Sequence, residues 1–424
     1  MSLVLIWQSG SPASSDTFSY VLTGQTSLYP YLKIEVEFAT DPTTAAVTWT
    51  EITPYVLSFS CRRGRQHDLA RIEAGTMDMR LDNRDRRFDP SYAASPYSPN
   101  VVPLRRIRVR ASWSSVIYPV WQGYVEAWPP SWPDGGKNDV VTLRAVDGFK
   151  VLNLSSLRDA SFSSEDTGTR ISNVLGTVSI PSADYSVGAG SVTLVASGTV
   201  SDDTTALGHI LEVVDSEGGG AVFYASRGGT FIFENQRHRI ANETVSSGTY
   251  VDSAGTTGLT YRNLLASYDD ADLWNQVTIT PSGGTAETID DATSQTTYFK
   301  RALSLSGLHA RQGEAAAVAS IIVYRQSDPQ LRFPAMEVIG AANPSVLWPK
   351  LLALELSDRL TVSRTPPGGG AAMSQACHVE AIDHEIGTDH WITRLQLSKA
   401  DAASTFWVLG TNTLETGTPG IVGY

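Results

Sequence analysis

Cysteine is scarce in this chain of 424 residues, which contains only Cys61 and Cys377. Two cysteines cannot build a disulfide-rich scaffold or a zinc site made of cysteine ligands, so both classes are excluded. The two residues lie far apart in the sequence, and nothing in the sequence supports a bridge between them. We expect two small buried thiols instead.

Long hydrophobic runs are also absent, because no stretch approaches the length of a membrane-spanning helix. The apolar residues 3–7 are too few for the hydrophobic region of a signal peptide, and no basic residues precede them. We therefore expect a protein that is synthesised and folded in the cytoplasm.

Lysine is rare, with six residues against 26 arginines. Arginine makes planar, bidentate contacts, whereas lysine mostly stays solvated, so this bias is typical of protein–protein interfaces. The net charge is −12, yet residues 62–110 hold twelve arginines against six acidic residues. The rest of the chain therefore carries about −18, and the arginine-rich region stands out against an acidic background.

That region, residues 52–111, organises the chain. Residues 76–82 and 106–111 alternate strictly between polar and apolar side chains, which predicts two half-buried strands. The loop between them is rich in Arg, Asp, Tyr and Pro, more than a self-contained domain needs, so we expect it to contact another subunit. The predicted interface residues are Arg62, Arg63, Arg65, Arg84, Arg86, Arg87, Phe88, Tyr97, Arg106, Arg108 and Arg110.

The same region carries a series of motifs. They are WTEITPYV at residues 49–56, CRRGR at 61–65, EAGT, LDNRDRRFDP at 81–90, SPYSP, VWQGYVEAW at 120–128 and VTLRAVDGF at 141–149. Together they resemble the opening of tail-tip minor tail proteins of long-tailed bacteriophages, which are similar to the baseplate-hub family. Later segments, among them LWNQVTIT and LELSDRLTV, fit the family more loosely. The resemblance implies a trimer with two related barrels in each chain, and it brings no catalytic motif and no cofactor.

Periodicity divides the chain into three regions. Residues 1–150 contain at least six predicted strands, which favours a barrel or sandwich. Asp166 or Thr167 can cap one helix, and Asp203 or Thr204 can cap a second. With the hairpin that follows, they predict a small α+β domain at 151–244. Residues 245–424 are again rich in strands, with one helix at 311–324 and an extended tail from 410. The predicted fold class is mainly β, with two β-barrel-like domains flanking an α+β insertion.

Several histidines and aspartates are candidate metal ligands. His378, His384 and His390 are evenly spaced, but a spacing of six matches no short zinc motif, and we expect solvated side chains on two exposed strands. Asp269, Asp270 and Asp272 lack the fixed ligand spacing of a calcium loop. We therefore expect no metal and no cofactor.

Catalysis and nucleic-acid binding also receive little support. No G-x-S-x-G motif occurs, although paired acids for glycoside hydrolysis remain open. Arg106, Arg108 and Arg110 could follow a phosphate backbone. The acidic net charge and the aspartates among the arginines favour an interlocking protein interface instead.

Three functions follow as hypotheses. The first is a non-enzymatic virion protein of a phage tail tip: a trimeric baseplate hub that joins a sixfold tube to a threefold tip and lines the DNA ejection path. Its expected partners are its own copies, the distal tail or tail tube protein, the tape measure protein, and the central fibre or other tip proteins. DNA would pass without specific binding, and contact with the host envelope would be indirect. The second is a hexameric distal tail protein, and the third is a carbohydrate-binding or carbohydrate-hydrolysing β-protein.

Overall fold

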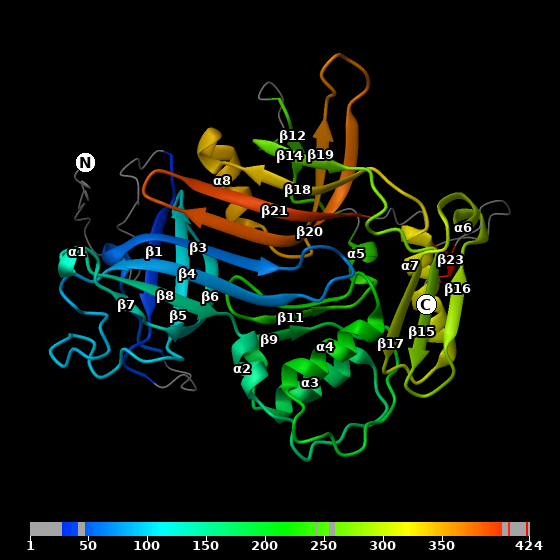
Figure 1. Ribbon diagram of the computed structural model, residues 1–424, viewed down its shortest axis with the longest axis horizontal. Coiled ribbons are helices and arrows are strands. Elements are labelled where there is room, and N and C mark those ends of the chain that lie inside the picture. Colours follow the sequence, from blue (N-terminus) through cyan, green and yellow to red (C-terminus); the bar gives the residue numbers. More distant parts are fainter. Residues whose placement is uncertain are drawn as a thin grey trace.

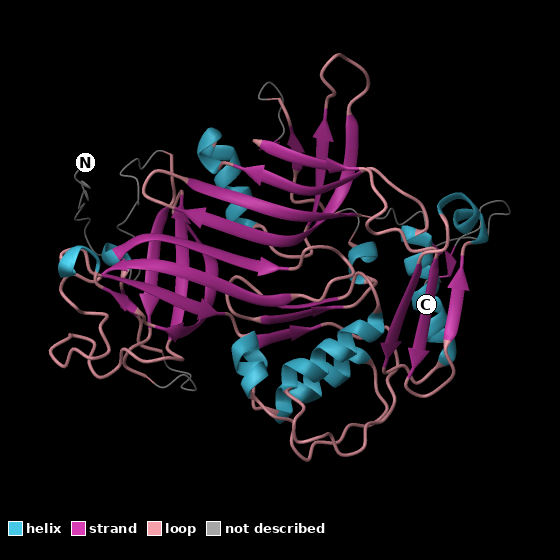
Figure 2. Ribbon diagram, in the orientation of Figure 1, coloured by secondary structure: helices cyan, strands magenta, loops and turns pink. Residues whose placement is uncertain are grey.

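The computed structural model describes residues 28–40, 47–242, 245–253 and 259–400, with the backbone of residues 406–407 and 421–422. Most of the extended tail predicted from residue 410 lies outside the described residues. Two sets of long strands occupy much of the molecule, with a helical layer and a smaller sheet beside them (Figures 1 and 2). The prediction of a mainly β fold with helical insertions is confirmed.

The first region of the chain is an antiparallel sheet in the order β3–β4–β8–β6–β5–β1–β2 (Figure 1). Its strands are β1 (Tyr31–Val36), β2 (Thr50–Glu51), β3 (Val56–Gly64), β4 (Glu73–Asp82), β5 (Arg106–Trp113), β6 (Val116–Ala127), β7 (Pro130–Ser131) and β8 (Val140–Val146). The turns η1 (Thr53–Tyr55) and α1 (Pro133–Gly136) connect them. The two predicted strands are confirmed as β4 and β5, and the apolar side chains Met77, Met79 and Leu81 are buried as their alternation requires.

The second region contains α2 (Phe149–Leu154), α3 (Thr167–Thr177), η2 (Ser182–Asp184), α4 (Ala206–Glu217) and α5 (His238–Ala241). A small sheet joins β9 (Tyr185–Val187), β10 (Val222–Ala225) and β11 (Phe231–Glu234). Asp166 caps α3 as predicted, because its side chain accepts a hydrogen bond from the amide of Thr169. The cap of α4 is Thr205, next to the predicted position.

The third region contains a second large set of strands and a separate small sheet. The large set comprises β12 (Thr249–Val251), β13 (Leu259–Thr260), β14 (Asn263–Ser267), β18 (Arg332–Val338), β19 (Arg359–Arg364), β20 (Met373–Ile386) and β21 (Trp391–Lys399). The small sheet comprises β15 (Gln276–Pro281), β16 (Glu287–Asp290) and β17 (Ala302–Gly307), against which α7 (Gln312–Gln326) packs. A short ladder of β22 (Phe406–Trp407) and β23 (Ile421–Val422) follows.

The helices of the third region differ from the prediction of one helix. The predicted helix is α7, but α6 (Ala292–Tyr298), α8 (Pro344–Ala353) and the turn η3 (Gly340–Ala342) are also present. The apolar pattern of residues 352–362 predicts one strand, whereas α8 ends at Ala353 and β19 begins at Arg359. Pro349 lies inside α8, and a proline within a segment argues against a helix, so the sequence does not predict one here. The buried residues of α8 are Leu347, Trp348, Leu351 and Leu352.

The two predicted barrels are not closed. In the first region, residues 50–64 bend at η1, so that β2 pairs with β1 while β3 pairs with β4 at the other end of the sheet. In the third region, residues 259–267 bend in the same way, so that β13 pairs with β12 and β14 pairs with β18. Closure fails in the first region because the second edge of β3 is occupied by β20.

This pairing of β3 with β20 joins the two regions into one sheet of fifteen strands among the described residues. The first half of β20 pairs with β19, and its second half, from Ala381 onward, pairs with β3. A β-bulge between Val379 and Ala381 marks the change of partner, since β-bulges bend a strand and redirect it. The two sets of strands therefore share one continuous strand.

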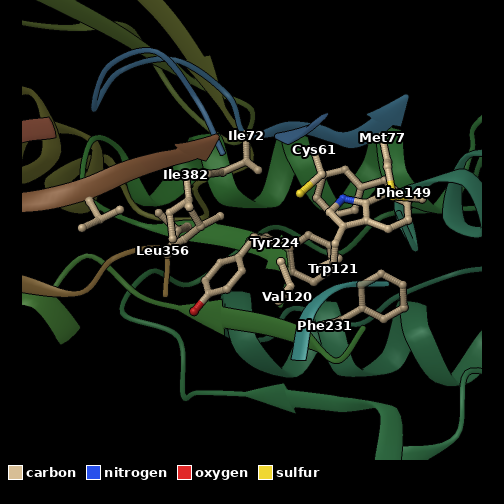
Figure 3. Close-up of a cluster of buried hydrophobic side chains, with 14 of the residues drawn as sticks. Cys61, Ile72, Met77, Val120, Trp121, Phe149, Tyr224, Phe231, Leu356 and Ile382 are labelled. Carbon is tan, nitrogen blue, oxygen red and sulfur yellow. The ribbon is translucent and has the colours of Figure 1, made fainter. Parts of the chain in front are cut away.

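A hydrophobic core lies where the three regions meet, and Figure 3 shows side chains from all of them facing one another. Its labelled members are Cys61, Ile72, Met77, Val120, Trp121, Phe149, Tyr224, Phe231, Leu356 and Ile382. The prediction of two buried thiols is confirmed, because Cys61 and Cys377 are both buried and both free. Burial raises the pKa of each thiol to about 12, which keeps both groups protonated and unreactive.

Candidate assembly interface

The arginines at the end of β3 lie inside the protein. Arg63 donates from Nη1 to Glu355 Oε1 at 2.5 Å and to the carbonyl oxygen of Ala225 at 3.3 Å. The backbone amide of Arg227 donates to the other oxygen of Glu355 at 3.0 Å. Arg63 therefore connects β3 to the second and third regions of the chain. Arg62 lies beside Asp383 in the register of β3 and β20.

Arg65 takes part in a second buried contact, centred on Glu380. Arg65 Nε donates to Glu380 Oε2 at 2.6 Å, and Arg239 Nη1 donates to Glu380 Oε1 at 2.5 Å. Ser398 Oγ also donates to Oε1, at 2.5 Å. Burial alone would raise the pKa of Glu380, but the charges of Arg239 and Arg65 hold it well below its usual range. Glu380 is the extra residue of the bulge in β20, so this ion cluster fixes the point where β20 changes partner.

The arginines of β5 pair with acidic residues of the neighbouring strand β1. Arg108 Nε and Arg110 Nη2 lie 2.7 and 2.8 Å from Glu35 Oε2, and Arg106 Nε lies 3.3 Å from Glu37 Oε2. The alternation of residues 33–38 predicts that Lys33, Glu35 and Glu37 face solvent, and that prediction is wrong because all three are buried. The opposed arginines make the burial of Glu35 and Glu37 possible, since a buried charge requires a partner, and Lys33 Nζ lies 3.8 Å from Glu35 Oε1. Each arginine of the stripe has an acidic partner within the chain, which disfavours a phosphate track.

The loop that follows β4 is anchored by aromatic side chains. Phe88 has no exposed surface, and its ring lies 5.7 Å from the ring of Tyr55 and 5.9 Å from that of Trp128. Tyr97 stacks on Phe38 with ring centroids 4.2 Å apart. Phe88 is therefore a core residue of its own chain, and the loop is an ordered projection rather than a loose one.

The arginines of this loop are exposed, and each is held by an aspartate of the same loop. The side chains of Arg84, Arg86 and Arg87 are 67%, 46% and 21% exposed. Arg84 binds Asp82 through Nε at 2.9 Å, Arg86 binds Asp89 through Nη2 at 2.8 Å, and Arg87 binds Asp85 through Nε at 2.7 Å. The guanidinium of Arg87 also lies 3.7 Å from the centroid of the Tyr55 ring. The structure thus separates the predicted interface residues into a buried group, a stripe paired within its sheet and a rigid exposed group.

The histidines are placed differently from the prediction. His378 and His384 are buried, not solvated, and burial lowers the pKa of each to about 3. His384 Nδ1 lies 3.0 Å from Thr393 Oγ1, while His390 is at the turn beside Asp389. In the part of the chain that the structure describes, no group of three or more His, Cys, Asp or Glu residues could hold a metal ion.

A polar groove of about 680 Å³ lies between the end of α7, the loop before β15 and the end of β21. It contains Asp269 and Asp272, two of the aspartates that were compared with a calcium loop. Arg332 binds both, with Nη2 2.8 Å from Asp269 Oδ1. Both carboxylates are therefore ion-paired, which disfavours their use as a general acid and base. No helix among the described residues is long and apolar enough to cross a membrane.

The residues that hold the three regions together are not evident in the sequence. They are Glu355, Glu380, Arg227 and Arg239. Glu380 stands among other polar residues in the segment CHVEAIDHEI, and nothing there distinguishes it from a solvated side chain. Its role depends on Arg65, which lies 315 positions away. A local pattern carries no signal for such a contact.

The fold, rather than the sequence, relates this chain to known proteins. No family model and no curated protein matches the sequence. The fold is similar to a tail protein from Neisseria meningitidis MC58, with a TM-score of 0.57 and 12% identity over 87% of this chain and 97% of that one. It is also similar to the 43 kDa tail protein of prophage MuSo2 from Shewanella oneidensis, with a TM-score of 0.53 and 11% identity over 88% of this chain and 97% of that one. The resemblance seen in the motifs is confirmed at the level of the fold, which is that of bacteriophage tail proteins.

Proposed function

We propose that the protein is a structural, non-enzymatic component of a bacteriophage tail tip, a baseplate hub that forms a trimeric ring. The ring would join a sixfold tail tube or distal tail ring to a threefold tip or central fibre. The observation that carries this proposal is the arrangement of the two large β regions. Each of them contains a bent segment, residues 50–64 or 259–267, that contacts both ends of its set of strands.

Two β regions in a single chain, each with such a bent segment, would provide a physical route between the two symmetries. Three chains would present six β regions around the axis, so a sixfold partner would meet a comparable surface at every position. Heterologous contacts between copies would close the ring without leaving a free surface. The β3–β20 pairing and the Glu380 ion cluster would fix the angle between the two regions. A fixed angle is required if the six positions are to be equivalent.

The exposed charges of the loop after β4 support a contact with a neighbouring subunit. Arg84 and Arg86 are held by aspartates on a loop anchored by Phe88, so little conformational entropy would be lost on binding. Other copies, the distal tail or tube protein, the tape measure protein and the tip or fibre proteins are the proposed partners. DNA would pass through the ring without specific binding, because the arginines of β5 are paired within the chain.

Immunogold labelling of intact particles tests the proposed location. Antibodies against this protein should label the tail tip, at the end distant from the capsid. Labelling along the tube, or absence of the protein from purified particles, would contradict the proposal.

A further inference from the structure

Phe299 is an exposed aromatic residue in a strained backbone conformation. Its side chain is 85% exposed, more than any other large hydrophobic side chain in the described part of the chain. It directly follows α6, with φ 61° and ψ 166°. This region of backbone space is occupied almost entirely by glycine, because a Cβ atom is unfavourable there. Phe299 therefore carries a backbone cost and a solvation cost at the same position.

The surrounding structure holds this conformation in place. Asn275 is fully buried, and its Nδ2 donates to the carbonyl oxygen of Phe299 at 2.8 Å. The Oδ1 of the same side chain accepts from the amide of Arg301 at 2.8 Å. The amide of Asn275 donates to the carbonyl oxygen of Arg301 at 3.1 Å, and Asn275 Nδ2 also donates to Ser294 Oγ at 3.0 Å. The buried side chain of Asn275 thus forms hydrogen bonds with the backbone of both Phe299 and Arg301. These bonds fix the backbone conformation at Phe299 and therefore the direction in which its side chain leaves the backbone.

The fold gains little from the ring itself, because a side chain with this exposure packs against almost nothing. Glycine at this position would relieve the strain and would avoid the exposed ring. A strained residue that persists under such a clamp is typical of a functional contact. Rigid aromatic side chains that fill a pocket on a partner often dominate the energy of an interface.

We propose that Phe299 is a preorganised anchor that inserts into an apolar socket on a neighbouring protein of the tail. This inference rests on the proposed function, because it places the partner in the same particle. The clamp by Asn275 would reduce the conformational entropy that is lost when the ring is inserted. The ion pair between Arg301 and Asp270, at 2.7 Å, ties the loop of Phe299 to the loop that carries Tyr268, which is 69% exposed. A second aromatic side chain is therefore available on the adjoining loop.

Charge favours a protein partner over a lipid surface. Around α6 the charges nearly balance, because Asp270 pairs with Arg301 and the exposed Asp290 is matched by the exposed Lys300 beside Phe299. The whole chain carries a net charge of −12. An anionic bilayer would repel a chain of this net charge, and a single Phe buries too little apolar area to offset that repulsion. A protein socket with a basic or neutral rim has no such conflict.

The first test uses the isolated protein and does not depend on the proposed function. Thermal unfolding is measured for the wild type, Phe299→Gly and Phe299→Ala. The glycine variant should unfold at a temperature equal to or above that of the wild type, and above that of the alanine variant, because only glycine removes the strain. If both variants unfold several degrees below the wild type, the ring serves the fold and the inference is overturned.

The second test uses purified tail particles that carry the photo-cross-linker p-benzoylphenylalanine at position 299. The same amino acid at position 154 is the control, since Leu154 is 62% exposed on α2. The cross-linker at position 299 should form a covalent product with one other tail protein, and the cross-linker at position 154 should not. In a separate measurement, Phe299→Ser should reduce incorporation of this protein into tail particles at least tenfold, whereas Leu154→Ala should not. Normal incorporation of Phe299→Ser without a cross-link would overturn the inference and leave the proposed function intact. Absence of the wild-type chain from particles would refute the proposed function itself. Phe299-dependent binding to phosphatidylcholine–phosphatidylglycerol vesicles would also overturn the inference, in favour of a membrane.

Discussion

Arg65 Nε and Glu380 Oε2 lie 2.6 Å apart, although the two residues are separated by 315 positions in the sequence. Arg239 binds the same carboxylate from the second region of the chain. One buried carboxylate therefore receives hydrogen bonds from both other regions, at the bulge where β20 leaves β19 and joins β3. This contact determines how the two large β regions are joined.

Removal of that carboxylate should be costly. Glu380→Ala leaves the guanidinium groups of Arg65 and Arg239 buried without their partner, and loss of one member of a buried ion cluster typically costs about 3–5 kcal/mol. The free energy of unfolding in urea measures this cost. Asp82→Ala is the matched control, because its partner Arg84 is exposed, and it should change stability far less. If both substitutions lowered the free energy of unfolding equally, the buried Glu380 cluster would contribute no more stability than an exposed ion pair.

Gly64 should tolerate no side chain. Its φ is +110°, and a Cβ atom there would lie 2.1 Å from the carbonyl oxygen of Glu380. Gly64→Ala should therefore separate β3 from β20 and lower the melting temperature sharply. Gly135 also has a positive φ, +65°, but its Cβ would meet nothing within 4 Å. Gly135→Ala should cost only about 1 kcal/mol of backbone strain, and a similar loss in both variants would contradict the close approach at Gly64.

Stability should fall on mild acidification. Burial lowers the pKa of His378 and His384 to about 3, whereas the ordinary value is 6.5. Below pH 6.5 the unfolded chain binds more protons at these sites than the folded chain does, so stability is lost as the pH falls from 6.5 toward 3. Each histidine should account for roughly 2 kcal/mol of the loss by pH 5.

Urea unfolding between pH 8 and pH 5 measures this dependence. His384→Gln should make the dependence shallower, and His378→Gln should do the same, because each removes one of the two buried imidazoles. The placement of His384 would be refuted by a wild-type slope in the first variant.

The exposed arginines of the loop after β4 should matter for assembly and not for folding. Arg84→Ala combined with Arg86→Ala removes two exposed side chains and leaves the aromatic anchors Phe88 and Tyr97 in place. The melting temperature should stay within about 2 °C of the wild type, because both side chains are exposed and the buried Asp89 keeps its hydrogen bonds from Ser91. Incorporation into tails, measured by quantitative immunoblotting of purified particles, should fall. Wild-type incorporation would show that this loop is not the subunit contact.

Local patterns in the sequence predict the local structure well. Strict alternation at residues 76–82 identifies β4, and the cap at Asp166 identifies the start of α3. The pairing of β3 with β20 could not be predicted, because it joins segments more than three hundred positions apart. The burial of Glu35, Glu380 and His384 has no local signal for the same reason, since a polar side chain looks solvated until its distant partner is known. Phe299 also gives no signal, because its strain is visible only in the backbone angles.

The copy number of this protein in a tail particle distinguishes a trimeric hub from a hexameric ring. Cryo-electron microscopy of the tail tip, or quantitative mass spectrometry against a tube protein of known stoichiometry, supplies that number. We expect three copies in one ring, with the two large β regions of each chain alternating around the axis. Six copies in one ring would contradict it and would favour a distal tail protein.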